Sequence, residues 1–197
     1  MRIKHAALIP AAALAMALAA CGSDDNTSTN APTSVATETS AAAATSCPTA
    51  APAADVQPQW TLQGATGSME MTGSTDTAAP KITITTPFSV TETQVKTLTE
   101  GDGAVVSEAA TVSVCYEGVD GRDGKVFDSA YQRGEPASFP LDGVVVGFKK
   151  AIAGQKVGST VGVAMTSADG YPDGMPDAGI QKGDTLVFSL KILSAQG

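Results

Sequence analysis

The sequence predicts an α+β domain in which an antiparallel β-sheet wraps around one short α-helix. From Lys81 onward, short stretches alternate between apolar and polar residues, which is the pattern of half-buried strands. Only the stretch around Phe148 has the spacing of an amphipathic helix. Several strands with a single helix are expected to form a sheet that carries the helix on its apolar face. The length of 197 residues allows one such domain plus appendages.

The expected strands follow one another along the chain. They lie at residues 82–84, 94–98, 111–116, 126–127, 160–165 and 185–193. The clearest is Thr111–Tyr116, in which Val112 and Val114 share one face with Tyr116 because side chains alternate along a strand. In the last strand, Leu186 and Phe188 begin an apolar face of the same kind.

The connections between these strands carry turn signals. Asp120-Gly121 and Asp123-Gly124 predict a hairpin between the strand at 111–116 and Val126-Phe127. A calcium loop is the alternative there, but the spacing of the aspartates does not match the EF-hand pattern. The loop from Ser167 to Asp184 is too long for a simple connection, and such loops are usually functional.

One short helix is expected around Phe148, Ala151 and Ile152. These residues fall at positions i, i+3 and i+4, so that they share the face of the helix that packs on the sheet. Lys149 and Lys150 then point outward, and Gly154 ends the helix.

The N-terminus has the pattern of an export signal. A positively charged start precedes 15 apolar residues, Ala6 to Ala20, a stretch too short to span a bilayer comfortably. We expect residues 1–20 to be a signal peptide that is cleaved before Cys21, whose thiol then carries lipid, as in bacterial lipoproteins. The alternative is an ordinary secretory signal that is cut after Ala20. Either version places the protein outside the cytoplasm, and the lipidated version anchors it to the outer face of the cell membrane.

The composition then divides the rest of the chain. From Gly22 to Ala54, 25 of 33 residues are Ala, Ser, Thr or Pro, which is typical of a flexible linker. We therefore expect residues 21–54 to be a lipidated tether and residues 80–197 to be the main domain. Residues 55–79 contain two short alternating stretches, Trp60–Leu62 and Met69–Met71, and could form an N-terminal extension folded onto the domain.

Charge and residue types exclude several classes of function. The only histidine, His5, lies in the expected signal peptide, so the mature chain has no Ser-His or Cys-His pair and no histidine metal ligand. We expect no cofactor. The formal charge of −8 argues against a nucleic-acid partner. Cys47 and Cys115 remain after Cys21 is acylated, and the sequence leaves open whether they form a disulfide or stay free.

Aromatic residues gather in the second half of the chain, where seven of the nine fall between Tyr116 and Phe188. Such a concentration is what an apolar binding pocket requires. Short motifs accompany them in a fixed order. They are Val112-x-Val114-x-Tyr116-x-Gly118, Asp123-Gly124-x-x-Phe127-Asp128-Ser129, Arg133-x-x-Pro136, Phe139-x-Leu141, Val144-Val145-x-Gly147-Phe148, Tyr171, Ile180 and Thr185 to Phe188.

This series resembles FKBP-type peptidyl-prolyl cis-trans isomerases (rotamases) over about Pro80 to Leu193. The resemblance implies an FKBP-like fold and a set of site residues. Those expected to act in catalysis are Tyr116, Phe127, Asp128, Tyr171 and Phe188, and those expected to bind substrate are Arg133, Phe139, Val144, Val145, Phe148 and Ile180. The family's tryptophan is replaced by Phe148, and Ala137 stands where the family often has phenylalanine. The resemblance also implies that Asp128 meets Arg133 and Tyr116 at the pocket rim, and that the Ile180 backbone N–H anchors the substrate.

The residue types suit rotation about the bond before proline. The planar imide is more charge-separated than the twisted one, so a dry aromatic pocket favours the twisted state without a nucleophile, metal or general base. We expect an exported isomerase that binds proline-containing polypeptides and accelerates folding outside the cytoplasm, with macrolide inhibitors as further ligands of the pocket. The alternatives are a non-catalytic peptide-binding chaperone on the same fold and a structural surface lipoprotein.

Overall fold

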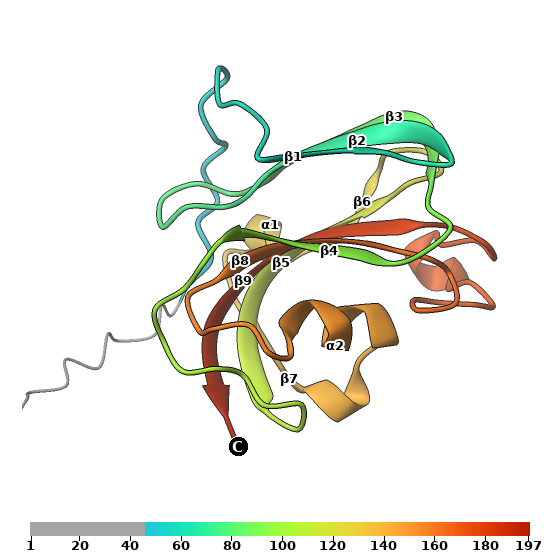
Figure 1. The fold of residues 1–197 in the computed structure, drawn as a ribbon. Coiled ribbons are helices and arrows are strands. Elements are labelled where there is room, and N and C mark those ends of the chain that lie inside the picture. Colours follow the sequence, from blue (N-terminus) through green and yellow to red (C-terminus); the bar gives the residue numbers. More distant parts are fainter. Residues whose placement is uncertain (1–45) are drawn as a thin grey trace, which may run out of the picture. The chain divides into compact units, whose positions relative to one another are not determined.

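The computed structural model describes residues 46–197, which form two β-sheets and several short helical segments (Figure 1). The three-stranded sheet contains β1 (Trp60–Gln63), β2 (Thr66–Thr72) and β3 (Lys81–Ser89) in that order. The six-stranded sheet has the order β4-β8-β9-β5-β6, and β7 also pairs with β5. Its strands are β4 (Gln94–Thr99), β5 (Thr111–Asp120), β6 (Val126–Ser129), β7 (Ala137–Pro140), β8 (Thr160–Met165) and β9 (Leu186–Gln196). All pairings are antiparallel.

The helix α2 (Val146–Ile152) lies against one face of the six-stranded sheet (Figure 1). Its Ala151 and Ile152 are fully buried in a core cluster that also contains Val112 of β5 and Ile192 of β9. Burying a side chain as large as that of Ile152 stabilises the fold by about 1.5–3 kcal/mol. The helix stops before Gly154, whose φ of +80° lies in the left-handed region that favours glycine. The predicted fold class, an antiparallel sheet with one short helix on its apolar face, is confirmed.

The three-stranded sheet covers the opposite face of the six-stranded sheet. Trp60, Met69 and Met71 are buried against Ala164 and Val187, which point away from α2. Gly162 of β8 allows this contact, because a Cβ there would lie 2.7 Å from the sulfur of Met71 and 2.8 Å from the Trp60 ring. Residues 55–79, whose structure the sequence left open, thus contribute β1 and β2.

The strands and the hairpin lie where the sequence predicts them, with some differences in length. The strand at 160–165 has the predicted ends, whereas β5 continues from Tyr116 to Asp120. Four elements were not predicted: a single helical turn, α1 (Ala130–Arg133), the strand β7, and two short 3₁₀ helices, η1 (Leu141–Gly143) and η2 (Pro176–Ala178). A four-residue helix is too short to show a helical period, and β7 ends in a proline at the edge of the sheet.

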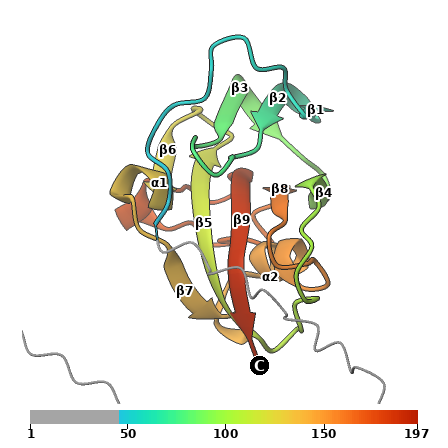
Figure 2. The same cartoon turned by 90° about the vertical axis from the view of Figure 1, so that its left-hand side faces the viewer.

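The segment before β1 is attached to the domain, contrary to the flexible tether expected up to Ala54. Cys47 forms a disulfide with Cys115 of β5, so these thiols are not free. The backbone N–H of Cys47 donates to the carbonyl oxygen of Gly134 (3.0 Å), and that of Ala79 donates to Ala50 (2.8 Å). Figure 2 shows this segment running past α1 toward β1. The interpretation as a tether is therefore wrong for residues 46–54, because a covalent bond supplies the attachment that the composition does not.

The expected signal peptide at residues 1–20, the lipid-bearing Cys21 and the tether from 21 to 45 lie outside the described residues. Within residues 46–197, no helix is long and apolar enough to cross a membrane.

Candidate active site

An aromatic pocket of about 500 Å³ lies between α2, β5, β6 and the loop before β9. Nine of the eleven residues expected at the site line it: Tyr116, Phe127, Asp128, Phe139, Val144, Val145, Phe148, Tyr171 and Phe188. The described structure thus brings together residues from Tyr116 to Phe188 that are far apart in the sequence.

Phe188 of β9 lies at the centre of the aromatic cluster. Its ring meets Phe148 at a centroid distance of 4.8 Å and Phe127 at 5.4 Å, and both pairs are edge-to-face. Tyr116 packs edge-to-face on Phe148 at 5.8 Å. Such contacts contribute about 0.5–1.5 kcal/mol each beyond the buried area. Gly118 leaves room for them, since a Cβ there would lie 2.6 Å from the Phe188 ring and 2.7 Å from the Phe127 ring.

A β-bulge turns two neighbouring residues of β6 toward the same pocket. Gly118 pairs with Asp128, but Val119 pairs with Val126, so Phe127 is an extra residue without an opposite partner. In a regular strand, Phe127 and Asp128 would point to opposite faces. Because the bulge interrupts the alternation, both line the pocket.

The rim of the pocket contains the expected polar trio. The Asp128 carboxylate accepts hydrogen bonds from the Tyr116 hydroxyl and from Nη1 of Arg133. Nη2 of Arg133 donates to the Tyr116 oxygen at 3.2 Å, and the guanidinium carbon lies 5.7 Å from the Tyr116 ring centroid. Arg133 itself does not line the pocket; it holds Asp128 from outside.

The electrostatics of the rim keep Tyr116 and Arg133 protonated. Burial raises the pKa of Tyr116, and its hydrogen bond to Asp128 adds to the effect. The bond to Asp128 likewise raises the pKa of Arg133, with a smaller contribution from the Tyr116 oxygen. The hydroxyl of Tyr116 therefore stays a donor to Asp128 at physiological pH.

The structure places Ile180 outside the lining of the pocket, so its expected role in substrate binding stays a prediction. Ile180 is only 2% exposed and belongs to the core beside the pocket rather than to its lining. Its backbone N–H donates to the carbonyl oxygen of Met175 at 3.1 Å, and Met175 N–H donates back to Ile180 at 2.9 Å. A narrow turn of the loop thus uses the N–H that was expected to reach substrate. By contrast, the N–H of Val145, which lines the pocket, has no acceptor within residues 46–197.

The loop between β8 and β9 also supplies wall residues that were not expected. Met175, Asp177 and Ala178 line the pocket together with Tyr171. The sequence signal was the length of the loop, which predicted a function but could not show which residues turn inward.

A cluster of charges fixes the base of this loop. Arg122, in the turn after β5, donates through Nε to Asp184 (3.2 Å) and through Nη2 to the carbonyl oxygen of Gly179 (3.1 Å). Asp184 also accepts from the backbone N–H of Gln181 at 2.7 Å. Burial raises the pKa of Asp120, which also pairs with Arg122, to about 6.

Among the described residues, no group of three or more His, Cys, Asp or Glu side chains is arranged to hold a metal ion.

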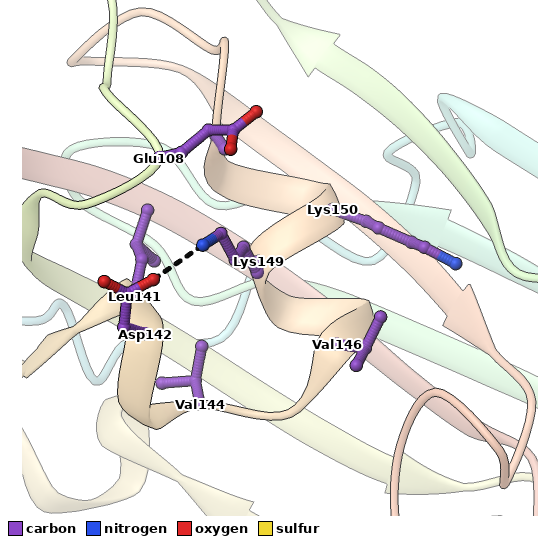
Figure 3. Close-up of a pocket in the computed structure, with 8 residues that line it drawn as sticks. Glu108, Leu141, Asp142, Val144, Val146, Lys149 and Lys150 are labelled. Carbon is purple, nitrogen blue, oxygen red and sulfur yellow. Dashed lines mark hydrogen bonds and ion pairs between the residues drawn. The ribbon is translucent and has the colours of Figure 1, made fainter.

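A second pocket of about 500 Å³ adjoins the first and shares Val144 with it. Figure 3 shows apolar and charged side chains around it, with Lys149 paired to Asp142; the two atoms lie 2.7 Å apart. It contains no aromatic residue. The aromatic pocket is therefore the candidate active site.

The chain is similar to known peptidyl-prolyl isomerases. The family model of FKBP-type peptidyl-prolyl cis-trans isomerases matches residues 103–193. A probable FK506-binding protein of Corynebacterium glutamicum is 36% identical over 96 residues, which cover 48% of this chain and 80% of the relative. The FKBP-type 22 kDa isomerase of Escherichia coli is 36% identical over 100 residues, covering 51% of this chain and 48% of the relative.

The chain belongs to the FKBP-type peptidyl-prolyl cis-trans isomerase family. The family resemblance and the class of enzyme drawn from the motifs are confirmed. A crystal structure of a peptidyl-prolyl cis-trans isomerase from Pseudomonas syringae matches with a TM-score of 0.48 and 27% identity, over 53% of this chain and 76% of that one.

Proposed function

We propose that this protein accelerates cis–trans isomerisation before proline in proteins outside the cytoplasm, and that lipid on Cys21 anchors it to the outer face of the cell membrane. The observation that supports the activity is the aromatic pocket with a fixed polar rim, in which Asp128 is held by Tyr116 and Arg133. The support for export is the pattern of the first 21 residues.

The proline ring is expected to lie against Phe188 and Phe148 at the centre of the pocket. Burying three ring methylenes contributes about 2.4 kcal/mol of binding, at roughly 0.8 kcal/mol each. This part of the binding is the same for the planar and the twisted imide, so it does not by itself speed rotation.

Rate acceleration needs interactions that favour the twisted imide. A ten-thousandfold acceleration corresponds to a preference of roughly 5.4 kcal/mol. Two features support such a preference. The aromatic walls exclude water. Water would otherwise stabilise the planar imide, because this state is the more charge-separated one. The polar groups of the rim are already oriented, so their arrangement costs little reorganisation during the reaction. The N–H of Val145 is the remaining candidate to bind a substrate carbonyl, since that of Ile180 is bonded to Met175.

A protease-coupled assay with a prolyl peptide tests the activity. We expect the exported chain to accelerate isomerisation, and a macrolide inhibitor to compete for the same pocket. Binding of proline peptides without acceleration would instead support the non-catalytic chaperone. Absence of any binding would support the structural lipoprotein.

Mass spectrometry of the mature N-terminus tests the anchor. We expect acyl chains on Cys21, and Cys21→Ser should leave an uncleaved precursor or release the protein into the medium. Two or more chains suffice for stable anchoring. A mature N-terminus without lipid would show that the signal is an ordinary secretory one.

A further inference from the structure

The helical turn α1 places Arg133 at the active site but has little stability of its own. It spans only Ala130–Arg133, and short helices are marginal because forming the first turn costs more than it gains. Its own sequence supplies an N-cap, since the Ser129 hydroxyl accepts from the N–H of Gln132 at 3.2 Å, and a C-terminal glycine, Gly134, with a φ of +75°. The remaining support must come from what packs around it.

That support comes from the N-terminal part of the chain. Ala130 and Tyr131 are buried in a cluster with Cys47 and Cys115. The Tyr131 hydroxyl donates to Ser74 at 2.7 Å. Residues 46–79 lie outside the region, 103–193, that the family model matches. The position of α1 therefore depends on a segment that the family motifs do not include.

Cys47 connects two of the three elements that build the polar rim, β5 and α1. Its sulfur is bonded to Cys115, the neighbour of Tyr116 on β5, and its backbone N–H donates to Gly134, the residue after Arg133. Both cysteines are buried, at 3% and 1% exposure. The disulfide thus fixes the position of the end of α1 relative to the strand that carries Tyr116.

The ion pair at the rim depends on such a support. The side chains of Arg133 and Asp128 are 49% and 40% exposed. Exposed ion pairs contribute little free energy by themselves, because solvent screens them and ordering two side chains costs entropy. The pair cannot hold α1 in place; α1 has to be held so that the pair can form.

We propose that Cys47, through its disulfide to Cys115, is a positioning residue for the isomerase: it fixes α1 so that Arg133 holds Asp128 against Tyr116. This inference rests on the proposed activity. Loss of the disulfide lets α1 shift, and the Asp128 carboxylate then loses its cationic partner Arg133 at the pocket rim.

The test compares four forms of the full chain: wild type, Cys47→Ala with Cys115→Ala, Arg133→Ala, and the triple variant. The readouts are kcat/KM on a prolyl peptide, measured well below the melting temperature, and the melting temperature itself. We expect the cysteine pair and Arg133→Ala each to lower kcat/KM roughly tenfold, since misplacing a site group by a fraction of an ångström has effects of this order. Because both act through the same ion pair, the triple variant should be no slower than Arg133→Ala.

Met69→Ala serves as the matched control. Met69 is fully buried in the three-stranded sheet and is not part of the cluster around α1. It should lower the melting temperature and leave kcat/KM unchanged. If the cysteine pair lowers only the melting temperature, or if its effect on kcat/KM multiplies with that of Arg133→Ala, the disulfide is merely structural and the inference is wrong.

Reduction of the wild type gives a second route if the cysteine variant does not fold. A small dithiol converts Cys47 and Cys115 to thiols while it is itself oxidised to a cyclic disulfide. Folded, reduced protein should show the same tenfold loss, and full activity after reduction would overturn the proposal. A wild type without isomerase activity would instead refute the proposed function.

Discussion

Asp128 faces the pocket because Phe127 is inserted into β6 as a bulge. Without the extra residue, the carboxylate and the ring would leave the strand on opposite faces. The bulge brings an apolar wall and a charged group to the same cavity from adjacent positions. The two residues therefore affect the protein in different ways when they are replaced.

Asp128→Leu should leave the domain folded and lower kcat/KM by about tenfold or more, because it removes the acceptor of Tyr116 and Arg133 without opening a cavity. Phe127→Ala is the contrasting variant: it removes wall area, so melting temperature and activity should fall together. Thermal melting beside the prolyl-peptide assay checks both. Wild-type turnover in a folded Asp128→Leu protein would remove the carboxylate from the mechanism.

Asp120 makes the stability depend on pH. Burial raises its pKa to about 6 in the folded protein, above the ordinary value near 3.9 of the unfolded chain. The folded state therefore binds this proton more tightly, so the carboxyl group contributes stability that is present below about pH 4 and is lost as the pH rises through about 6. Asp120→Asn removes this titration.

The measurement is the free energy of unfolding in urea from pH 4 to pH 7 for wild type and Asp120→Asn. The free energy of unfolding of the wild type should exceed that of the variant by less and less as the pH rises across this range. A difference that stays constant would show that Asp120 does not titrate between the two states as proposed.

At the scale of elements, Gly118 of β5 leaves room for the pocket rings of Phe188 on β9 and Phe127 on β6. Gly118→Ala should destabilise the domain by about 1–3 kcal/mol and lower activity, because the new methyl group collides with the rings of Phe188 and Phe127. Gly143→Ala is a suitable control for stability, since its Cβ would meet only Pro140 at 3.5 Å. Equal melting temperatures for the two variants would contradict this account.

The sequence predicted the elements whose signal is local. Alternation placed β8, and the spacing of Phe148, Ala151 and Ile152 placed α2. The motifs located the aromatic wall, because those residue types occur at fixed intervals from one another. The position of α1 could not be predicted, since contacts with Cys47 and Ser74, far away in the sequence, stabilise it.

The same reason explains two differences between the expectations and the structure. The resemblance assigned a free N–H to Ile180, but the loop folds back and bonds it to Met175. Composition assigned the segment up to Ala54 to a linker, but one cysteine in it has a partner on β5. In both cases a contact between distant residues decides the outcome, and neither periodicity nor composition reports such contacts.

For the whole molecule, the disulfide closes a sequence separation of 68 residues. Loop-closure entropy gives such a bond a stabilisation of about 4 kcal/mol. A chain that begins at Asp55 lacks Cys47, so we expect its melting temperature to fall well below that of a chain that begins at Ser46. Denaturant unfolding of the two truncated chains, with a Cys47→Ala version of the longer one, measures the effect. Equal stability of all three would show that the cross-link contributes nothing.

The disulfide also determines where a mechanical load enters the domain. A pull on the chain before Cys47 passes through the sulfur–sulfur bond to Cys115 in β5, so the residues from 48 to 114, with the whole three-stranded sheet, lie outside the path of the force. In a single-molecule stretching experiment, the oxidised protein should therefore show no release of this segment. After reduction, an additional lengthening of roughly 230 Å is expected, at about 3.4 Å for each residue step of the sequence separation of 68. A protein held to a membrane by its N-terminus would thus transmit tension directly to the strand that carries Tyr116 and shield the sheet made by β1, β2 and β3.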